Sequence, residues 1–238
     1  MIGVRGLRKS FGSAPVLAGI DLTVPTGESL CVIGQSGSGK SVLLRCILGL
    51  EAPDAGQVTW QGRPLTGAHR AAFMARFGML FQGAALFDSL SVWQNVAFRL
   101  RQRMPDARAR AIALDKMARV GLAPEVADLL PAELSGGMAK RAGLARAIAD
   151  DPAVIFFDEP TTGLDPIRAT RINQLIRGIV TETGATAITI THDMTSVRAI
   201  GDRVVLLEAG RIAWDGPVAQ MQDAAPLAGF LGAGGGGW

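Results

Sequence analysis

Residues 34–41, with the sequence GQSGSGKS, constrain the fold of this chain more than any other stretch. They follow the apolar run SLCVIG at 29–34, which is typical of a buried strand, and precede SVLLRCIL, whose pattern predicts a helix from Ser41 to Leu48. The pattern G-x-x-x-x-G-K-[S/T] between a strand and a helix is that of a loop whose backbone N–H groups bind phosphate. The sequence therefore predicts a strand, a phosphate loop and a helix in this order.

Apolar runs of similar length recur later in the chain, at 153–158, 185–192 and 202–210. Strands that are apolar along their whole length are usually covered on both faces, as in a parallel sheet. Helical patterns lie between them, including Pro166 to Glu182 and Met194 to Ile200. This alternation predicts an α/β fold with a mainly parallel core sheet, and 238 residues that are 48% hydrophobic suffice for one well-buried core.

Two segments depart from this alternation. Roughly the first sixty residues read as short strands joined by glycine and proline turns, which predicts an antiparallel β edge subdomain. Residues 88–150 are almost wholly helical in pattern and predict a helical subdomain inserted in the α/β core. The stretch 229–238 is rich in glycine, so we expect one domain over 1–228 followed by a flexible tail.

Charge and cysteine content narrow the functional classes. The net charge of +3 is small and spread along the chain, which argues against nucleic acid as the main partner and leaves a membrane surface or an anionic ligand open. Cys31 and Cys46 lie in apolar runs and are expected to be buried thiols. The N-terminus lacks the apolar core of a signal peptide, and no apolar run approaches the roughly 18 residues of a membrane span, so we expect a soluble, cytoplasmic chain.

The phosphate loop assigns roles to individual groups. Backbone N–H groups from Ser36 to Lys40 would bind phosphate oxygens, and the Lys40 ammonium would reach the β- and γ-phosphates. The Ser41 hydroxyl would hold Mg²⁺. A glycine-rich turn in some other α/β enzyme is the alternative reading.

Acidic residues close the apolar run VIFFDEP. Asp158 would hold the water shell of Mg²⁺, and Glu159 would polarise an attacking water. An acidic turn after a strand is the alternative. His192 ends another apolar run, where it would hydrogen-bond the γ-phosphate, unless it is a capped structural histidine. His69 lies in a polar stretch and reads as a surface residue.

A second pair of glycines precedes another predicted helix, in LSGGMAKRAGLARAIA at 134–149. A helix N-terminus offers unpaired N–H groups and a partial positive charge, and glycines let a phosphate approach the backbone. Ser135, Gly136 and Gly137 therefore predict a second anion site, although no lysine lies within it.

With GQSGSGKS, LSGGM, VIFFDEPTTGLD and THD in this order, the chain resembles the nucleotide-binding subunits of ATP-binding cassette (ABC) transporters over nearly its whole length. The resemblance implies an ATPase of the P-loop NTPase fold that uses ATP and Mg²⁺. It implies that Gln82 touches Mg²⁺ and the attacking water and signals to the membrane subunit, and that Asp165 lies in the loop joining two ATP sites. Phe11 stands where an aromatic residue, more often tyrosine, stacks on adenine.

The resemblance also completes the expected sets of functional residues. The catalytic set is Glu159, His192 and Gln82, and the metal set is Ser41, Gln82 and Asp158. The nucleotide-binding set is Phe11, Gly34, Gln35, Ser36, Gly37, Ser38, Gly39, Lys40, Ser41, Ser135, Gly136, Gly137 and Asp165.

The same resemblance implies an answer to the question of the second anion site. Two copies of such a subunit pack head to tail, so the glycine pair of one copy faces the γ-phosphate held by Lys40 of the other. ATP then holds the dimer together, and hydrolysis releases it. The expected partners are therefore a second copy and membrane permease subunits.

Met138 stands where the family usually has glutamine, and its surroundings narrow the resemblance further. They resemble the ATPases of bacterial phospholipid transporters that work with a mammalian-cell-entry family lipid-binding protein. This implies a peripheral location on the cytoplasmic face of the bacterial inner membrane. The alternatives are neutral drift from glutamine, with an unknown cargo, and a polar amino-acid importer.

Other readings are less consistent with the chain. Soluble cassette proteins that act on DNA or ribosomes usually carry two cassettes or a long coiled-coil insertion, and a non-catalytic regulator would be expected to lack Glu159 or His192.

The apolar residues after Gln82 predict a partly exposed groove for a helix of the membrane subunit, or else core of the helical segment. They are Ala84, Ala85, Leu86, Phe87 and Trp93.

Overall fold

A computed structural model describes residues 1–228, which fold into two compact units. The first unit combines residues 1–75 with the chain from Ile188 onward, and the second is Arg76–Ala187. The expected flexible tail at 229–238 lies outside the described residues.

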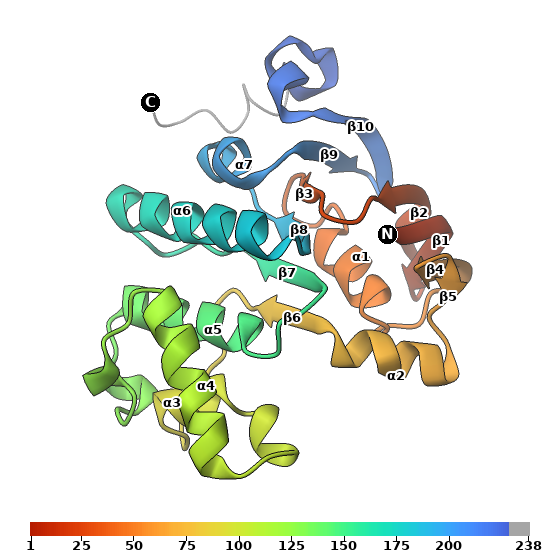
Figure 1. Ribbon diagram of the computed structural model, residues 1–238. Coiled ribbons are helices and arrows are strands. Elements are labelled where there is room, and N and C mark those ends of the chain that lie inside the picture. Colours follow the sequence, from red (N-terminus) through yellow and green to blue (C-terminus); the bar gives the residue numbers. More distant parts are fainter. Residues whose placement is uncertain (229–238) are drawn as a thin grey trace. The chain divides into compact units, whose positions relative to one another are not determined.

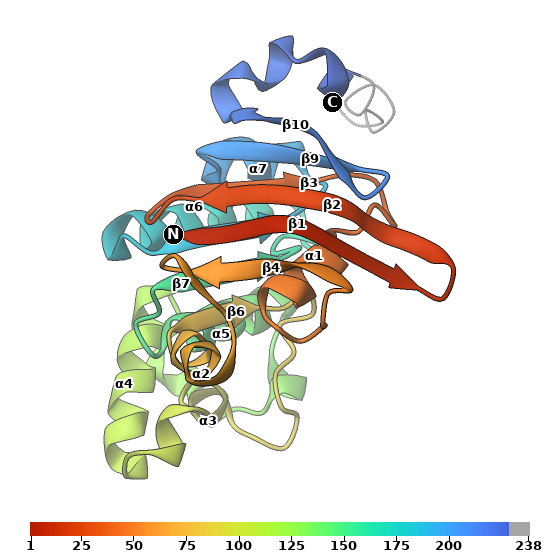
Figure 2. The ribbon, with the colours of Figure 1, turned by 90° about the vertical axis from the view of Figure 1, so that its right-hand side faces the viewer.

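An antiparallel sheet forms one layer of the first unit. Its strand order is β2-β1-β4-β5, and β1, β2 and β4 lie side by side in Figure 2. Ile2 on β1 pairs with Val24 on one side and with Trp60 on the other, and all three side chains are buried. The predicted antiparallel edge is therefore confirmed. The strands are β1 (Ile2–Phe11), β2 (Ala14–Val24), β4 (Ala55–Trp60) and β5 (Arg63–Pro64).

The other strands of the first unit centre on β3 (Ser29–Ile33), in which all five residues are buried. Leu30 of β3 pairs with Arg203 of β9 in a parallel ladder, and β10 adds to β9 antiparallel. Strand β8 ends in this unit, where Thr191 N donates to Val32 O at 3.3 Å. The remaining elements are α1 (Lys40–Ile47), α2 (Gly67–Ala75), β8 (Thr186–Ile190), α7 (Met194–Ile200), β9 (Arg203–Glu208), β10 (Arg211–Pro217) and a 3₁₀ segment (Val218–Asp223).

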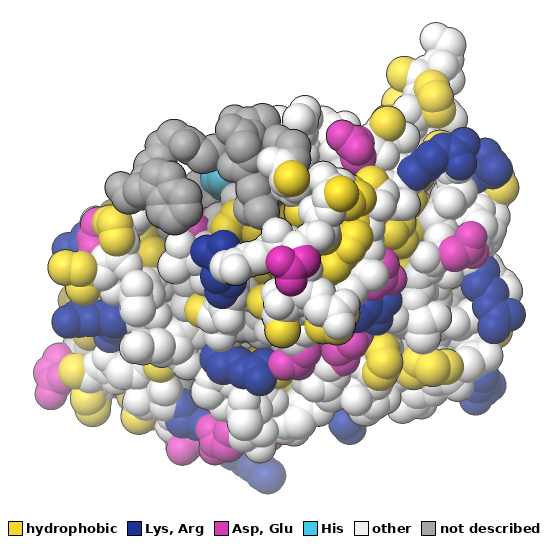
Figure 3. Space-filling view, turned by 90° about the horizontal axis from the view of Figure 1, so that it is seen from above, with side chains coloured by type: hydrophobic (Ala, Val, Ile, Leu, Met, Phe, Trp, Pro, Cys, Tyr) yellow, Lys and Arg dark blue, Asp and Glu magenta, His cyan; other side chains and the backbone are white. Residues whose placement is uncertain are grey.

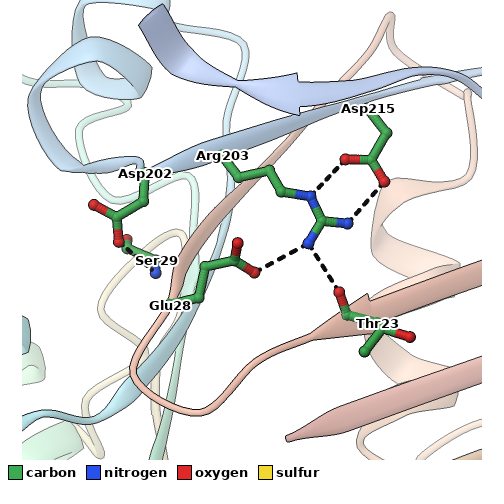
Figure 4. A network of polar contacts seen from close by, with 6 residues as sticks. All are labelled: Thr23, Glu28, Ser29, Asp202, Arg203 and Asp215. Atoms are coloured by element: carbon green, nitrogen blue, oxygen red, sulfur yellow. Dashed lines mark hydrogen bonds and ion pairs between the residues drawn. The ribbon is translucent and has the colours of Figure 1, made fainter.

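Arg203 joins four segments of the first unit (Figure 4). Its guanidinium donates to both carboxylate oxygens of Asp215 on β10, at 2.5 and 2.7 Å, and to Thr23 O on β2 at 2.9 Å. It also pairs with Glu28, just before β3, at 3.1 Å. Burial raises the pKa of Glu28, although the charge of Arg203 acts in the opposite direction. The network fixes the start of the strand that leads into the phosphate loop.

The second unit packs helices on a parallel strand pair. Phe77 of β6 pairs with Val154 of β7, and α5 packs against β6 (Figure 1). A Cβ at Gly78 would lie 1.9 Å from Ala147 O, so only glycine allows this close approach. The elements are β6 (Phe77–Leu80), α3 (Val92–Val96), α4 (Asp106–Arg119), α5 (Gly136–Ile148), β7 (Val154–Asp158) and α6 (Pro166–Thr183), with 3₁₀ segments at Leu100–Gln102, Pro124–Val126 and Pro131–Glu133.

Between residues 88 and 150 every element is helical, as predicted. The stretch 91–103 is not one continuous helix but contains α3 and a separate 3₁₀ turn. The compact second unit is also larger than 88–150, because β6, β7 and α6 belong to it. Ala84 and Trp93 are only 1% and 8% exposed, so for these two the core reading is the correct one.

The charge distribution on one face, the helices and the cysteines can each be compared with what the composition predicts. On the face drawn in Figure 3, basic and acidic side chains are interspersed, in keeping with the net charge of +3. Within residues 1–228, no helix is both long enough and apolar enough to pass through a bilayer. Cys31 and Cys46 are both buried free thiols, as predicted.

Burial of Cys31 should make stability depend on pH in the alkaline range. Burial raises the pKa of the Cys31 thiol from its ordinary value of 9.0 to about 12. Above pH 9 the unfolded chain therefore loses a proton that the folded chain keeps, so stability is lost as pH rises from 9 toward 12, by about 1.4 kcal/mol per pH unit. Denaturant unfolding at pH 8 and pH 10.5 measures this loss. The free energy of unfolding of Cys31→Ala should fall less over this pH range. An equal fall in both proteins would contradict the attribution of the pH dependence to Cys31.

Candidate active site

The phosphate loop is held in shape by glycines and by its own lysine. Strand β3 ends at Ile33 and α1 begins at Lys40, as the sequence predicted to within one residue. Gly39 adopts φ +103°, and a Cβ there would lie 2.9 Å from Val16 O. Lys40 Nζ donates to Gly34 O at 2.7 Å and to Gln35 O at 2.8 Å. The ammonium therefore lies over the loop into which phosphates are expected to bind.

The residues of this loop fit a phosphate group. The first N–H groups of α1 have no partner within the helix, and Gly39 has no side chain to cap them. Ser36, Gly37 and Ser41 are exposed, and a Cβ at Gly37 would meet nothing within 4 Å. Ser38 Oγ is buried without a hydrogen-bond partner among the described residues. A polyanion would supply acceptors to both the helix start and this hydroxyl.

Phe11 and His192 are the two other predicted nucleotide contacts in the first unit. Phe11 lies at the end of β1 and is 48% exposed, with Lys9 Nζ 5.2 Å from its ring centroid. The ring therefore presents an accessible aromatic face. His192 is exposed and follows β8 next to the end of β3, since Thr191 bonds to Val32.

His69 is not a simple surface residue. Its ring is half-buried and stacks on Trp60 at 5.4 Å between centroids. Its Nε2 lies 2.9 Å from Trp60 O. The polar sequence around it suggested full exposure, but α2 turns this side chain onto β4, where it has a structural role.

Two acids end β7 in the second unit. Asp158 is the last residue of the strand, and both Asp158 and Glu159 are half-buried. Glu159 has φ +47°, a conformation that costs a non-glycine residue roughly 1–3 kcal/mol and is concentrated at functional sites. Thr162 Oγ1 donates to Glu159 Oε2 at 3.0 Å. The backbone and this bond together fix the direction of the Glu159 carboxylate.

Gln82 lies in an exposed loop that begins after β6 and contains two strained residues. Ala84 and Ala85 have φ +63° and +48°. Helix α5 holds this loop: Lys140 Nζ donates to Gln82 O, and the Arg146 guanidinium donates to Ala84 O at 2.6 Å and Ala85 O at 2.8 Å. Burial lowers the pKa of Lys140, partly offset by the charges of Glu159 and Asp158.

The glycine pair stands at the start of α5, as predicted. Ser135 is the N-cap, and its hydroxyl accepts from Met138 N at 3.3 Å. Neither Gly136 nor Gly137 has a neighbour that would prevent close approach to the backbone, the nearest atom to a Cβ at Gly137 being Arg168 Cδ at 3.7 Å. A cavity of about 190 Å³ lies here, lined by Ser135, Gly137, Met138, Arg141, Arg168 and Arg171. Three arginines and a helix N-terminus line this cavity, and such groups attract anions.

Asp165 caps the helix that begins beside this cavity. Its carboxylate accepts from Arg168 N at 3.0 Å and pairs with Arg168 Nε at 3.2 Å. The backbone hydrogen bond from Arg168 holds the pKa of Asp165 below its ordinary value. The sequence indicated the position of Asp165 but not this capping role.

The predicted magnesium ligands are Ser41, Gln82 and Asp158. They offer a hydroxyl, an amide and a carboxylate, which are the oxygen donors that Mg²⁺ prefers. Among residues 1–228 no three histidine, cysteine, aspartate or glutamate side chains cluster as a metal site would require. A predicted set with a single carboxylate is what we expect for an ion that keeps several water ligands and binds substrate phosphates.

Comparison with known proteins identifies the family. The sequence profile described as ABC transporter matches residues 17–162, which include the phosphate loop, Gln82, the glycine pair, Asp158 and Glu159. The chain belongs to the ABC transporter family. It has the fold of the ATPase domain of ABC transporters, with the predicted α/β core, antiparallel edge and helical segment.

Curated relatives of this ABC ATPase domain are named after different transported molecules. It is 43% identical over 216 residues to the methionine import ATP-binding protein MetN of Mesorhizobium japonicum. It is 39% identical over 221 residues to the probable ribonucleotide transport ATP-binding protein mkl of Mycobacterium tuberculosis. These alignments cover 89% and 91% of this chain but only 59% and 61% of the relatives.

Solved ABC cassettes share the fold. The dimeric structure of the ATP-binding cassette MJ0796 in a post-hydrolysis state, bound to ADP and Pi, is 29% identical, with a TM-score of 0.82 over 92% of this chain and 99% of that chain. The structure of cbiO1 from Clostridium perfringens, part of the ABC transporter complex cbiONQ, is 26% identical, with a TM-score of 0.84 over 98% of this chain and 94% of that chain.

Proposed function

We propose that this ABC ATPase domain hydrolyses ATP as a head-to-tail dimer and thereby powers a membrane transporter. The proposal is supported by two helix starts with glycines, one with Lys40 beside it and one formed by Ser135 and two glycines. A single nucleotide needs one phosphate loop. The second helix start, at α5, has no lysine beside its glycines. In the proposed dimer it binds the phosphate held by the phosphate loop of the other copy.

Each predicted residue then has a chemical role in the proposed site. Phe11 stacks on adenine, and the loop from Gly34 to Ser41 binds the phosphates. Bound Mg²⁺ would neutralise phosphate charge, with Ser41, Gln82 and Asp158 as its protein ligands. Glu159 polarises the attacking water and His192 keeps it in line with the γ-phosphate. Asp165 lies between the two sites of the dimer.

Strained backbone supports the role of Glu159. A φ of +47° is unfavourable for glutamate, so the fold holds this residue in one direction rather than leaving it free in a turn. The bond from Thr162 Oγ1 to one carboxylate oxygen holds the carboxylate in a defined direction. This arrangement favours a positioned general base over the alternative of an acidic surface turn.

For the cargo we propose phospholipid, moved between bacterial membranes together with permease subunits and a mammalian-cell-entry family lipid-binding protein. The support is the sequence around Met138, which is half-buried and lines the cavity at the start of α5. The proposed location is the cytoplasmic face of the inner membrane.

The second candidate is an importer of a polar amino acid. The 43% identity to a methionine import protein favours an amino-acid importer, although the methionine side chain is apolar. Both candidates share every nucleotide-binding residue, so only the membrane complex separates them.

Purification of the full complex tests the two candidates. The chain would be captured from its native membranes with its bound subunits, and the complex would be reconstituted in nanodiscs. Phospholipid transport should mix labelled lipid with an acceptor membrane in an ATP-dependent manner, and L-methionine should not change the ATPase rate. Methionine-stimulated hydrolysis without lipid transfer would establish the second candidate instead. The Glu159→Gln complex is the control for ATP-independent lipid exchange.

A further inference from the structure

We propose that Lys140 is a positioning residue that fixes the backbones of Gln82 and Glu159 to the helix bearing the glycine pair. The inference rests on the proposed roles of Gln82 and Glu159 in hydrolysis. It adds a residue to which the phosphate-binding patterns assign nothing.

Lys140 joins three segments of the second unit through one ammonium group. Its Nζ donates to Gln82 O, after β6, and to Glu159 O, after β7, at 3.3 Å. The side chain starts from α5 and is only 6% exposed. Two residues that are far apart in sequence, and that are both expected to contact the attacking water, therefore share one donor.

A buried ammonium is a costly way to fill space. Lysine is almost never buried unless it is paired, because the charged group loses its hydration. A methionine would occupy a similar volume without this penalty. The two carbonyls that Nζ binds indicate a structural role for the charge, because both belong to segments that contain residues of unfavourable backbone conformation.

The strain in these loops explains why a donor is needed. Glu159 has φ +47°, and in the loop that contains Gln82 the residues Ala84 and Ala85 have φ +63° and +48°. Such conformations persist only where the surroundings hold them. Lys140 holds Gln82 in one loop and Glu159 in the other, and Arg146 on the same helix holds Ala84 and Ala85.

Helix α5 therefore connects the proposed contact with the second copy to the two residues proposed to act in hydrolysis. Its cap, Ser135, is proposed to contact the nucleotide of the second copy, and Lys140 lies little more than one turn further along. A shift of α5 on dimer formation would move both carbonyls together. Loss of the ammonium should thus impair the alignment of Gln82 and Glu159 and leave the phosphate loop intact.

Three variants test this inference. Lys140→Met removes the donor, Lys140→Arg restores one, and Lys116→Met is the matched control. Lys116 is also 6% exposed in the same unit, but its Nζ pairs with Asp151 on the surface, at 2.7 Å. For each protein, steady-state ATP hydrolysis gives kcat and KM, binding of a fluorescent ATP analogue gives Kd, and thermal unfolding gives Tm.

We expect kcat of Lys140→Met to fall roughly 100-fold, with KM and Kd within about threefold of the parent, because misplacement of catalytic groups by about 1 Å has this effect. Lys140→Arg should recover most of the rate, and Lys116→Met should keep its kcat even if its Tm falls. The inference is overturned if Lys140→Met keeps its kcat, if Lys116→Met loses as much, or if arginine restores nothing.

A separate variant distinguishes this inference from the proposed function. If Glu159→Gln hydrolyses ATP normally, the assignment of Glu159 fails whatever Lys140 does. If Glu159→Gln is inactive and Lys140→Met is fully active, only the positioning role of Lys140 fails. Retained nucleotide binding in Lys140→Met shows that the variant is folded.

Discussion

Glu159→Gln should stop ATP hydrolysis and leave ATP binding unchanged. The amide keeps the shape of the side chain and can still accept the bond from Thr162, but it cannot take a proton from water. General-base catalysis contributes about 10²–10⁴-fold to the rate, so the rate of phosphate release should fall by a factor of that size. Because the bound ATP then persists, the variant should accumulate as an ATP-dependent dimer, which size-exclusion chromatography with light scattering would detect.

Glu182→Gln is the matched control for this prediction. Glu182 makes an ion pair with Arg119 on the surface of the same unit, at 2.8 Å, and has no proposed role in hydrolysis. It should hydrolyse ATP at the parental rate and form no lasting dimer. Phosphate release by Glu159→Gln at that rate would remove Glu159 from the role of base.

Mixing two inactive variants should restore ATP hydrolysis if the sites are shared between copies. Lys40→Ala removes the phosphate-binding ammonium, which should weaken ATP binding about 10–100-fold. Gly137→Asp places a negative charge where the phosphate of the other copy would bind. The fold accommodates this aspartate, since the nearest atom to a Cβ at Gly137 is Arg168 Cδ at 3.7 Å, and acids are favourable in the first turn of a helix.

In a mixed dimer both substitutions fall in one of the two shared sites, and the other site is intact. Random mixing of equal amounts places half of the chains in mixed dimers, so about a quarter of the parental sites return. Hydrolysis and ATP-dependent dimer formation should therefore reappear on mixing, while each variant alone remains inactive. If each site were built within one copy, every site in the mixture would carry a substitution, and no activity would return.

Local features of the chain could be predicted from its sequence. The loop from Gly34 to Ser41 was expected between a strand and a helix, and β3 and α1 lie on either side of it. The helix at Pro166–Thr183 and the strand that ends at Asp158 were likewise expected to within a residue or two. Hydrophobic period, turn residues and spacing are local properties, and these elements depend mainly on them.

Tertiary contacts account for what the sequence did not indicate. Lys140 and Arg146 read as two cations on a helix, and nothing local indicates that carbonyls from the Gln82 loop lie against them. The sequence left Trp93 open between an exposed groove and the core, and the structure buries it with Arg101 and Arg110 over its ring at 5.3 and 5.5 Å. Such packing depends on segments that are distant in the chain, so the site was predicted as a set of residues without its supporting contacts.

The position of β3 has a consequence for the order of events during synthesis. The strand that leads to Lys40 pairs with β9 and bonds to the residue that follows β8, and both of these come from the last quarter of the chain. At about 5–20 residues per second, the ribosome would complete these neighbours on the order of ten seconds after the phosphate loop has emerged. A nascent chain that ends at residue 162 would contain the whole segment matched by the family profile, yet its β3 would lack both partners. Nucleotide should therefore bind only after β9 has been synthesised, so ATP binding to nascent chains would report that β9 has paired with β3.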